Sequence, residues 1–303
     1  MTGSSSASGL RVGVLGASGY GGAGLIERLM RHPHVRLAAI GSRAYLGQPL
    51  SASWPHLAGL DSPLRFASSD DVIAASDVVF CATPHGATAP LVAQAVAEGK
   101  RVIDMSADFR LDAREYEEWY GAPHPHPELL ADAVYGMVEL HRNELPGARI
   151  VASPGCNATA ASLALAPLAA AGLIGDAVIV NVLTGVSGAG RGPSQAMHYS
   201  EMNENARPYK PAGTHRHTAE IEAVGGRARA AAARGNGKEL LAVRARTCGV
   251  HAAHRADEPR HRRHPGDQAR YLGWTDALER GGRRASERLL RRRSADRRRY
   301  CSA

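Results

Sequence analysis

Short apolar runs alternate with helix-like segments through the first half of the chain. The runs 10–15, 35–40, 78–81 and 101–104 have the continuous apolar character of strands that are buried on both faces. Helical spacing of apolar residues follows in 25–30, and an alanine-rich helix-like segment occupies 87–98. This alternation predicts an α/β fold built on a doubly wound parallel sheet of the Rossmann type.

A glycine turn joins the first predicted strand to the first helix. Glycines at positions 16, 19 and 22 allow the backbone to turn tightly and to approach a pyrophosphate, whose charge then meets the helix N-terminus. Because a strand and a helix flank this turn, it indicates a dinucleotide site rather than an ordinary loop. The expected contacts are Gly16, Ala17, Ser18, Gly19, Tyr20 and Gly22.

The end of the second predicted strand bears on the choice of dinucleotide. Ser42 and Arg43 stand there, where an acidic side chain would bind the ribose 2′-hydroxyl of NAD. Hydroxyl and guanidinium groups accept a 2′-phosphate instead, so we expect NADP. Loops after later strands also line such a crevice, which brings Pro84, His85 and Arg110 close to the cofactor or the substrate.

A cysteine follows a Pro-Gly turn at the start of the second half. Cys156 directly precedes the alanine-rich helical segment 159–171, and a helix N-terminus stabilises negative charge on a sulfur. This placement indicates a nucleophile, although free cysteine is also a common buried residue. The helix leads to an apolar strand, 177–183, and then to a glycine-rich loop that ends at Arg191 and can bind an anion.

Two histidines stand near position 216. His215 and His217 are two residues apart, so a single helix face cannot present both, and we expect at most one to face Cys156. An imidazole there would pair with a thiolate and later move a proton. We expect no metal, since a third ligand at useful spacing is missing from this segment.

These motifs occur together and in one order, and in combination they resemble the N-acetyl-gamma-glutamyl-phosphate reductase family and its branch that reduces carrier-protein-bound aminoadipyl phosphate. The resemblance covers about residues 10–222. The motifs that carry it are the glycine turn, Ser42-Arg43, Pro84-His85-Gly86, residues 106–111, Ser153 to Cys156, Ser187 to Arg191, and His215 to Glu220.

The resemblance implies NADPH-dependent reductive dephosphorylation of an acyl phosphate to a semialdehyde, through a thioester on Cys156. It also implies a second, α+β catalytic domain like that of phosphorylating aldehyde dehydrogenases. His215 is then the preferred catalytic histidine and His217 the runner-up. Ser187 and Gly188 would contact the cofactor, and the substrate anions would meet Arg110 and Arg191.

The acyl group stays open between arginine and lysine biosynthesis. The acetylglutamyl branch usually has Tyr-Pro after the cysteine, whereas this chain has Asn157-Ala158, which is more similar to the aminoadipyl branch. Gly24 also replaces a residue that tends to be Glu in the family, which weakens only the helix. We expect the acetylglutamyl phosphate as substrate, with the carrier-protein-bound acyl phosphate as the alternative.

Charge is distributed unevenly along the 303 residues. The formal net charge is +8, but residues 224–303 hold 21 of the 37 basic and 8 of the 29 acidic residues, so the remainder is net acidic. This arginine-rich tail lacks the apolar periodicity of a sheet, and the resemblance stops before it. We expect it to be poorly ordered and the catalytic domain to be incomplete. A shifted reading frame in a GC-rich gene would explain it, and if the tail is genuine the chain is expected to be inactive.

The remaining sequence features set the expected organisation and location. We assign 1–9 to a flexible tail, 10–152 to the NADP-binding domain, 153–223 to the first part of the catalytic domain and 224–303 to the aberrant tail. Four scattered cysteines suit a reducing cytoplasm, and no segment resembles a signal peptide or a membrane span. Self-association into a homo-oligomer is expected by likeness to related reductases. Nucleic-acid binding by the basic tail is the low-ranked alternative.

Overall fold

The computed structural model describes residues 9–60, 63–175, 177–211, 213–224 and 244–252. All of them lie within one compact unit, Met1–Arg255. Among these residues, every helix is too short or too polar to pass through a bilayer.

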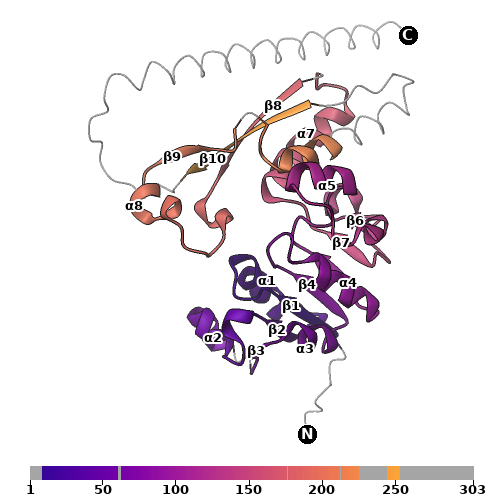
Figure 1. Ribbon diagram of the computed structural model, residues 1–303, viewed down its shortest axis with the longest axis vertical. Helices are drawn as coiled ribbons and strands as arrows, with labels where there is room; N and C mark the ends of the chain where they lie inside the picture. Colours follow the sequence, from indigo (N-terminus) through magenta and orange to yellow (C-terminus); the bar gives the residue numbers. More distant parts are fainter. Residues whose placement is uncertain (1–8, 61–62, 176, 212, 225–243, 253–303) are drawn as a thin grey trace, which may run out of the picture. The chain divides into compact units, whose positions relative to one another are not determined.

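A seven-stranded parallel sheet forms the first part of the chain (Figure 1). Its strand order is β3-β2-β1-β4-β5-β7-β6, so the order reverses between β1 and β4. In a doubly wound sheet, ligands bind outside the carboxyl ends of the strands at this reversal. The strands are β1 (Leu10–Leu15), β2 (Val35–Gly41), β3 (Phe66–Ala67), β4 (Val78–Cys81), β5 (Arg101–Asp104), β6 (Ala133–Tyr135) and β7 (Ile150–Ala152).

Two hydrophobic clusters cover the two faces of this sheet. One cluster joins β1, β4 and β5 to side chains of α3 and α4, and the other joins β1 and β2 to α1 and α2. Alternate residues of β1 enter different clusters, because successive side chains of a strand point to opposite faces. The helices are α1 (Tyr20–Met30), α2 (Leu50–Ser53), α3 (Ser69–Ala74), α4 (Ala89–Ala97), α5 (Ala113–Tyr120) and α6 (Val138–His141), with 3-10 turns η1 (Arg43–Tyr45), η2 (Pro55–Leu60) and η3 (Pro127–Asp132).

The predicted parallel α/β sheet is confirmed. Strands β1, β4 and β5 have the predicted bounds, and β2 extends one residue further. The sequence prediction missed β3, β6 and β7, which are only two or three residues long and therefore too short to show a hydrophobic period.

A three-stranded sheet and a long helix form the second part (Figure 1). The central strand, β10, pairs parallel with β8 and antiparallel with β9. The elements are α7 (Cys156–Ala170), β8 (Ala177–Thr184), η4 (Val186–Ala189), η5 (Gln195–Met197), α8 (Tyr199–Met202), β9 (Ala206–Tyr209) and β10 (Arg244–Ala252), and residues 217–224 are helical.

Strand β10 corrects the expectation that no sheet strand follows residue 223. It spans Arg244–Ala252 and fills the place between β8 and β9. Its sequence, RARTCGVHA, shows no regular apolar alternation, so the sequence pattern could not reveal it; backbone pairing with β8 along eight residues defines it instead. The expected tail at 1–9 and the other expected tail residues, 225–243 and 253–303, lie outside the described residues except for residue 9.

One buried carboxylate joins the loops that follow β4 and β5. Asp108 is fully buried, and its two oxygens accept hydrogen bonds from the backbone N–H groups of Gly86, Thr88 and Ala89 at 2.8, 3.2 and 3.0 Å. The hydroxyl of Tyr116 donates to it as well, at 3.3 Å. The carboxylate thus satisfies the amides at the start of α4 and holds the loop that carries Pro84 and His85.

We expect Asp108→Ala to lower the free energy of unfolding by about 3 kcal/mol or more, because each buried donor left without a partner costs about 1–3 kcal/mol. Urea denaturation followed by circular dichroism measures the change. Asp70→Ala is the matched control: this aspartate is exposed and contacts Gln94, and its loss should cost less than about 1 kcal/mol. Equal losses in the two variants would contradict the anchoring role of Asp108.

Candidate active site

The glycine turn has the backbone geometry that a pyrophosphate site requires. Gly16 has a φ of +76°, and a Cβ on this residue would collide with the carbonyl oxygen of Ala82. A Cβ on Gly22 would meet the Gly16 carbonyl oxygen at 2.5 Å. Gly19 precedes α1, and within that described helix no side chain caps the N-terminus and no acidic residue occupies the first turn. The first amides of α1 are therefore available to an anion.

Hydroxyl groups gather beside this turn at the end of β2. The Ser18 and Ser42 hydroxyl oxygens lie 2.8 Å apart, and Arg43 begins the 3-10 turn that follows. The arrangement supplies two hydroxyls and a nearby guanidinium, which are donors suited to a ribose 2′-phosphate.

A cavity of about 570 Å³ lies between the carboxyl edge of the parallel sheet and the start of α7. Its wall combines the start of α1 and the loops that follow β4, β5 and β7 with residues of the second part of the chain. Its polar and reactive lining includes Thr83, His85, Ser106, Arg110, Tyr120, Cys156, Asn157, Thr184, Lys210, His215, Arg216 and His217, and Gly21, Pro84 and Gly188 complete the wall nearest the expected cofactor.

Cys156 is the first residue of α7 and is exposed to this cavity. Gly155 is the N-cap residue, and within α7 no side chain caps the helix. The amides of the first helical turn therefore point toward the sulfur end of the helix, where their partial positive charge stabilises an anion.

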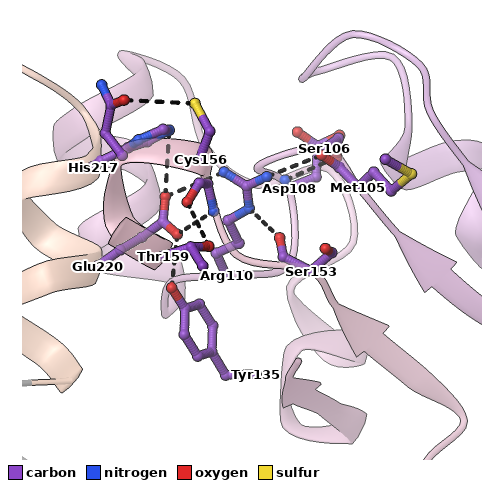
Figure 2. Close-up of polar contacts among 12 residues, drawn as sticks. Met105, Ser106, Asp108, Arg110, Tyr135, Ser153, Cys156, Thr159, His217 and Glu220 are labelled. Carbon is purple, nitrogen blue, oxygen red and sulfur yellow. Dashed lines mark hydrogen bonds and ion pairs between the residues drawn. The ribbon is translucent and has the colours of Figure 1, made fainter. Parts of the chain in front are cut away.

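A buried carboxylate holds the turn that carries Cys156 (Figure 2). Glu220 accepts a hydrogen bond from the Gly155 backbone N–H at 3.0 Å and one from the Tyr135 hydroxyl at 2.9 Å. Its other oxygen lies 3.2 Å from Nη1 of Arg110, in an ion pair whose side chains are 1% and 8% exposed. Arg110 also donates to the carbonyl of Ser153 at 2.7 Å, so both partners fix the same turn.

The two histidines approach the residues on either side of Cys156. Their rings lie 4.6 Å apart and both line the cavity. His217 packs so closely on Gly155 that a Cβ there would collide with the ring, and its Nε2 lies 3.8 Å from Glu220. Burial lowers the pKa of His217, and the charge of Glu220 only partly opposes this. The two-residue spacing does not keep the rings apart. Which of them faces Cys156 stays a prediction.

Asn157 connects the cysteine to the other ring. The Cys156 thiol donates to Oδ1 of Asn157 at 3.7 Å, and Nδ2 of this amide lies 3.3 Å from Nε2 of His215. The Asn157 side chain is buried directly beside the nucleophile. Asn157 thus links the sulfur to the His215 imidazole through two polar contacts.

The two arginines predicted to bind substrate have different surroundings. Arg110 lines the cavity, but Glu220 neutralises its charge. Arg191 donates to the Ser18 carbonyl at 3.0 Å and to the Ser53 hydroxyl at 2.6 Å, and its guanidinium stacks 4.3 Å over the ring of Trp54. Arg191 therefore contacts the glycine-turn region.

The sequence analysis gave no role in the site to several residues that the structure brings into it. Arg216 and Glu220 belong to the last motif that carries the resemblance, Lys210 lies a few residues before it, and Asn157 directly follows the cysteine motif. All four line the cavity or support its wall. Glu220 had one usable signal, because it lies three residues after His217 and therefore on the same face of a helix. Ser187, predicted to contact the cofactor, lies in η4 next to Gly188.

We expect Glu220→Ala to destabilise the protein by about 3–5 kcal/mol, because it leaves Arg110 as a buried charge without its carboxylate. Thermal and urea unfolding measure the loss. Adding Arg110→Met should recover part of it, since the unpaired charge is removed with its partner. The exposed Glu118→Ala is the matched control and should change stability by less than about 0.5 kcal/mol. A double variant less stable than the sum of both single changes would contradict this account.

Solved structures with this fold include two aspartate semialdehyde dehydrogenases. The structure from Candida albicans, determined with NADP, has a TM-score of 0.54 and 16% identity, and the match covers 81% of this chain and 68% of that chain. The second, from Vibrio cholerae, has a TM-score of 0.54 and 15% identity, with 80% and 70% covered. At these identities the likeness establishes the fold, and it confirms the Rossmann-type α/β prediction.

Sequence comparison is more specific. Residues 11–148 match the family described as semialdehyde dehydrogenase, NAD binding domain, and residues 156–235 match its dimerisation domain, twelve residues beyond the predicted end of the catalytic part. N-acetyl-gamma-glutamyl-phosphate reductases from Thermus thermophilus and Symbiobacterium thermophilum are 52% and 46% identical over 211 and 215 residues, each match covering 70% of this chain. The chain spans 60% and 62% of the lengths of these relatives. The two family matches and these relatives together show that the chain belongs to the N-acetyl-gamma-glutamyl-phosphate reductase family.

Proposed function

We propose that this protein reduces N-acetyl-gamma-glutamyl phosphate to the semialdehyde with NADPH, through a thioester on Cys156. The observation that carries the proposal is the exposed thiol of Cys156 at the first residue of α7, in one cavity with two histidines and the wall of the glycine turn. The names of relatives that are 52% and 46% identical to this chain over 211 and 215 residues support the substrate.

The residues of the chain divide the reaction into two steps. The Cys156 sulfur bonds to the acyl carbon while the carbon–oxygen bond to phosphate breaks, so phosphate leaves with the electron pair. NADPH, when bound, supplies the hydride that reduces the thioester carbon. Hydride addition leaves a negatively charged oxygen on this carbon, and an imidazole can donate a proton to it and later take that proton back. The carbon–oxygen double bond re-forms as the sulfur–carbon bond breaks, and the aldehyde and the Cys156 thiolate are released.

The cofactor proposal follows from the geometry beside the glycine turn. A Cβ on Gly16 or Gly22 would collide with the backbone, so the tight turn requires glycine at both positions, and the uncapped start of α1 suits a pyrophosphate. Ser42 and Arg43 would hold the 2′-phosphate, while Pro84, Ser187 and Gly188 would border the nicotinamide end. These residues support NADP over NAD.

Hydrogen bonding favours His215 as the histidine that serves Cys156. Its Nδ1 accepts a hydrogen bond from the His217 backbone N–H at 3.1 Å, so a neutral ring carries its proton on Nε2. Nε2 faces the amide of Asn157, which must then accept. Turning the amide over points its carbonyl at His215 and its NH2 group at the sulfur, where an N–H donor stabilises a thiolate.

Substrate branch, partners and location complete the proposal. A carrier-protein-bound aminoadipyl or glutamyl phosphate is the alternative substrate. It is favoured by Asn157, which follows the cysteine where the acetylglutamyl branch usually has Tyr. Self-association is supported by the dimerisation domain named for the family match. Cys81 and Cys156 are free thiols, which suit a reducing compartment and support a location in the cytoplasm. Nucleic-acid binding stays a low-ranked alternative, and most of its basic residues lie outside the described part of the chain.

The reaction run backwards tests the proposal directly. With NADP, inorganic phosphate and N-acetylglutamate semialdehyde, we expect the purified chain to form NADPH, measured at 340 nm. Cys156→Ser should lose this activity by about 10³-fold or more and retain NADPH binding, because only the nucleophile is removed. Cys81→Ser is the matched control and should keep the activity, because Cys81 lies buried in the sheet core. Absence of NADPH formation by the unaltered chain would overturn the proposed function.

The two histidines are separated by a paired substitution. We expect His215→Asn to lower the rate by about 10²–10⁴-fold, the usual contribution of a positioned acid or base. His217→Asn should have the smaller effect on rate and the larger effect on stability, because His217 is packed between Gly155 and Glu220. Steady-state kinetics and thermal unfolding measure both. A larger rate loss in His217→Asn would transfer the catalytic role to that ring.

A further inference from the structure

Positive charge in the cavity is not distributed as the sequence suggests. Of the cationic side chains that line it, Arg110 is paired with the buried carboxylate of Glu220. Arg191 contacts the glycine-turn region instead. The unneutralised charge of the cavity wall therefore rests on Lys210 and Arg216.

Arg216 is held in place by neutral groups. Its Nη1 lies 2.7 Å from Nε2 of His85, and its guanidinium lies 4.7 Å from the ring centre of Tyr120. A guanidinium can only donate, so His85 accepts and is neutral at this nitrogen. Burial, followed by the Arg216 charge, lowers the pKa of His85, which agrees with that role. The guanidinium keeps its full charge and has further N–H donors for a ligand.

Lys210 projects from the end of β9 with unusual backbone geometry. Its φ is +45°, a conformation that side-chain-bearing residues seldom adopt and that often marks a functional position. Its Nζ lies 5.7 Å from the ring centre of Tyr209. Desolvation and the nearby charge of Arg216 both lower the pKa of Lys210. The two cations thus repel each other, and within the described residues neither forms an ion pair with a carboxylate.

We propose that Lys210 and Arg216 form a subsite that binds phosphate or carboxylate oxygens of the substrate in the cavity of Cys156. Two partly desolvated cations without a carboxylate partner are stabilised by an anion placed between them, and a planar guanidinium beside an ammonium suits either oxygen group. The inference rests on the proposed function, because an acyl phosphate of a dicarboxylic acid carries both kinds of anion. It makes Arg110 a structural residue and Lys210 and Arg216 the specificity-determining ones.

Direct binding tests this subsite without turnover. In the full chain with Cys156→Ser, we expect isothermal titration calorimetry to show binding of inorganic phosphate, of N-acetylglutamate, or of both. We expect Arg216→Gln and Lys210→Gln each to weaken the binding of at least one of these anions by about tenfold or more, because each removes one charged donor. Arg142→Gln, an exposed arginine outside the cavity, is the matched control and should bind as the parent does.

The choice of anion identifies the group that the subsite takes. Loss of phosphate binding alone places the phosphoryl group between Lys210 and Arg216, and loss of N-acetylglutamate binding alone places the carboxylate there. Unchanged affinity for both anions in Arg216→Gln and Lys210→Gln, or no binding by the parent, would overturn the subsite. Arg216→Lys keeps the charge and should bind more tightly than Arg216→Gln, and circular dichroism checks that all variants fold.

The outcome is separable from that of the proposed function. If the chain is an active reductase but its affinity for both anions is unchanged in the Lys210 and Arg216 variants, the subsite is refuted and the reductase proposal stands. A chain without reductase activity that binds phosphate through these two residues would refute the reaction and leave the anion site.

Discussion

Glu220 joins three separate segments of the chain at a single buried carboxylate, and the reactive turn has its shape because of it. One oxygen serves the amide of Gly155 and the hydroxyl of Tyr135, and the other pairs with Arg110, which reaches on to the Ser153 carbonyl. Burying a charged pair is costly unless the remaining donors and acceptors are satisfied. Here hydrogen bonds to the turn that precedes Cys156 help to satisfy them and offset the cost of burial (Figure 2). The same hydrogen bonds fix the backbone position of the cysteine.

The same device supports the opposite wall. Asp108 accepts three backbone amides at the start of α4, and by this it fixes the loop that presents His85 to Arg216. Both carboxylates accept hydrogen bonds from backbone N–H groups at the start of a helix or in a turn, so each one fixes the position of the backbone itself. Hydrogen bonds to a buried carboxylate therefore support the cavity wall both at the nucleophile and near the cations, the first carboxylate coming from the helical residues 217–224 and the second from the loop after β5.

Local sequence carries the parts of this architecture that depend on local physics. Residues 10–22 predicted strand, turn and helix because apolar period, glycine conformation and helix start all act within a few residues, and Cys156 was found through its own turn. The Glu220–Gly155 bond spans 65 residues and the Arg216–His85 contact spans 131, so no spacing rule could indicate them. Strand β10 was missed for a related reason, since its pairing partners lie far away in sequence and its own pattern is polar.

Arg191 ties together two regions that a bound dinucleotide would touch. It donates hydrogen bonds to Ser18 and Ser53 and stacks on Trp54, whose indole N–H donates to the Ala17 carbonyl at 3.1 Å. These contacts hold the loop that contains Gly188 against the glycine turn. A single guanidinium therefore joins the two regions, so a ligand that displaced either one would also have to break hydrogen bonds of Arg191.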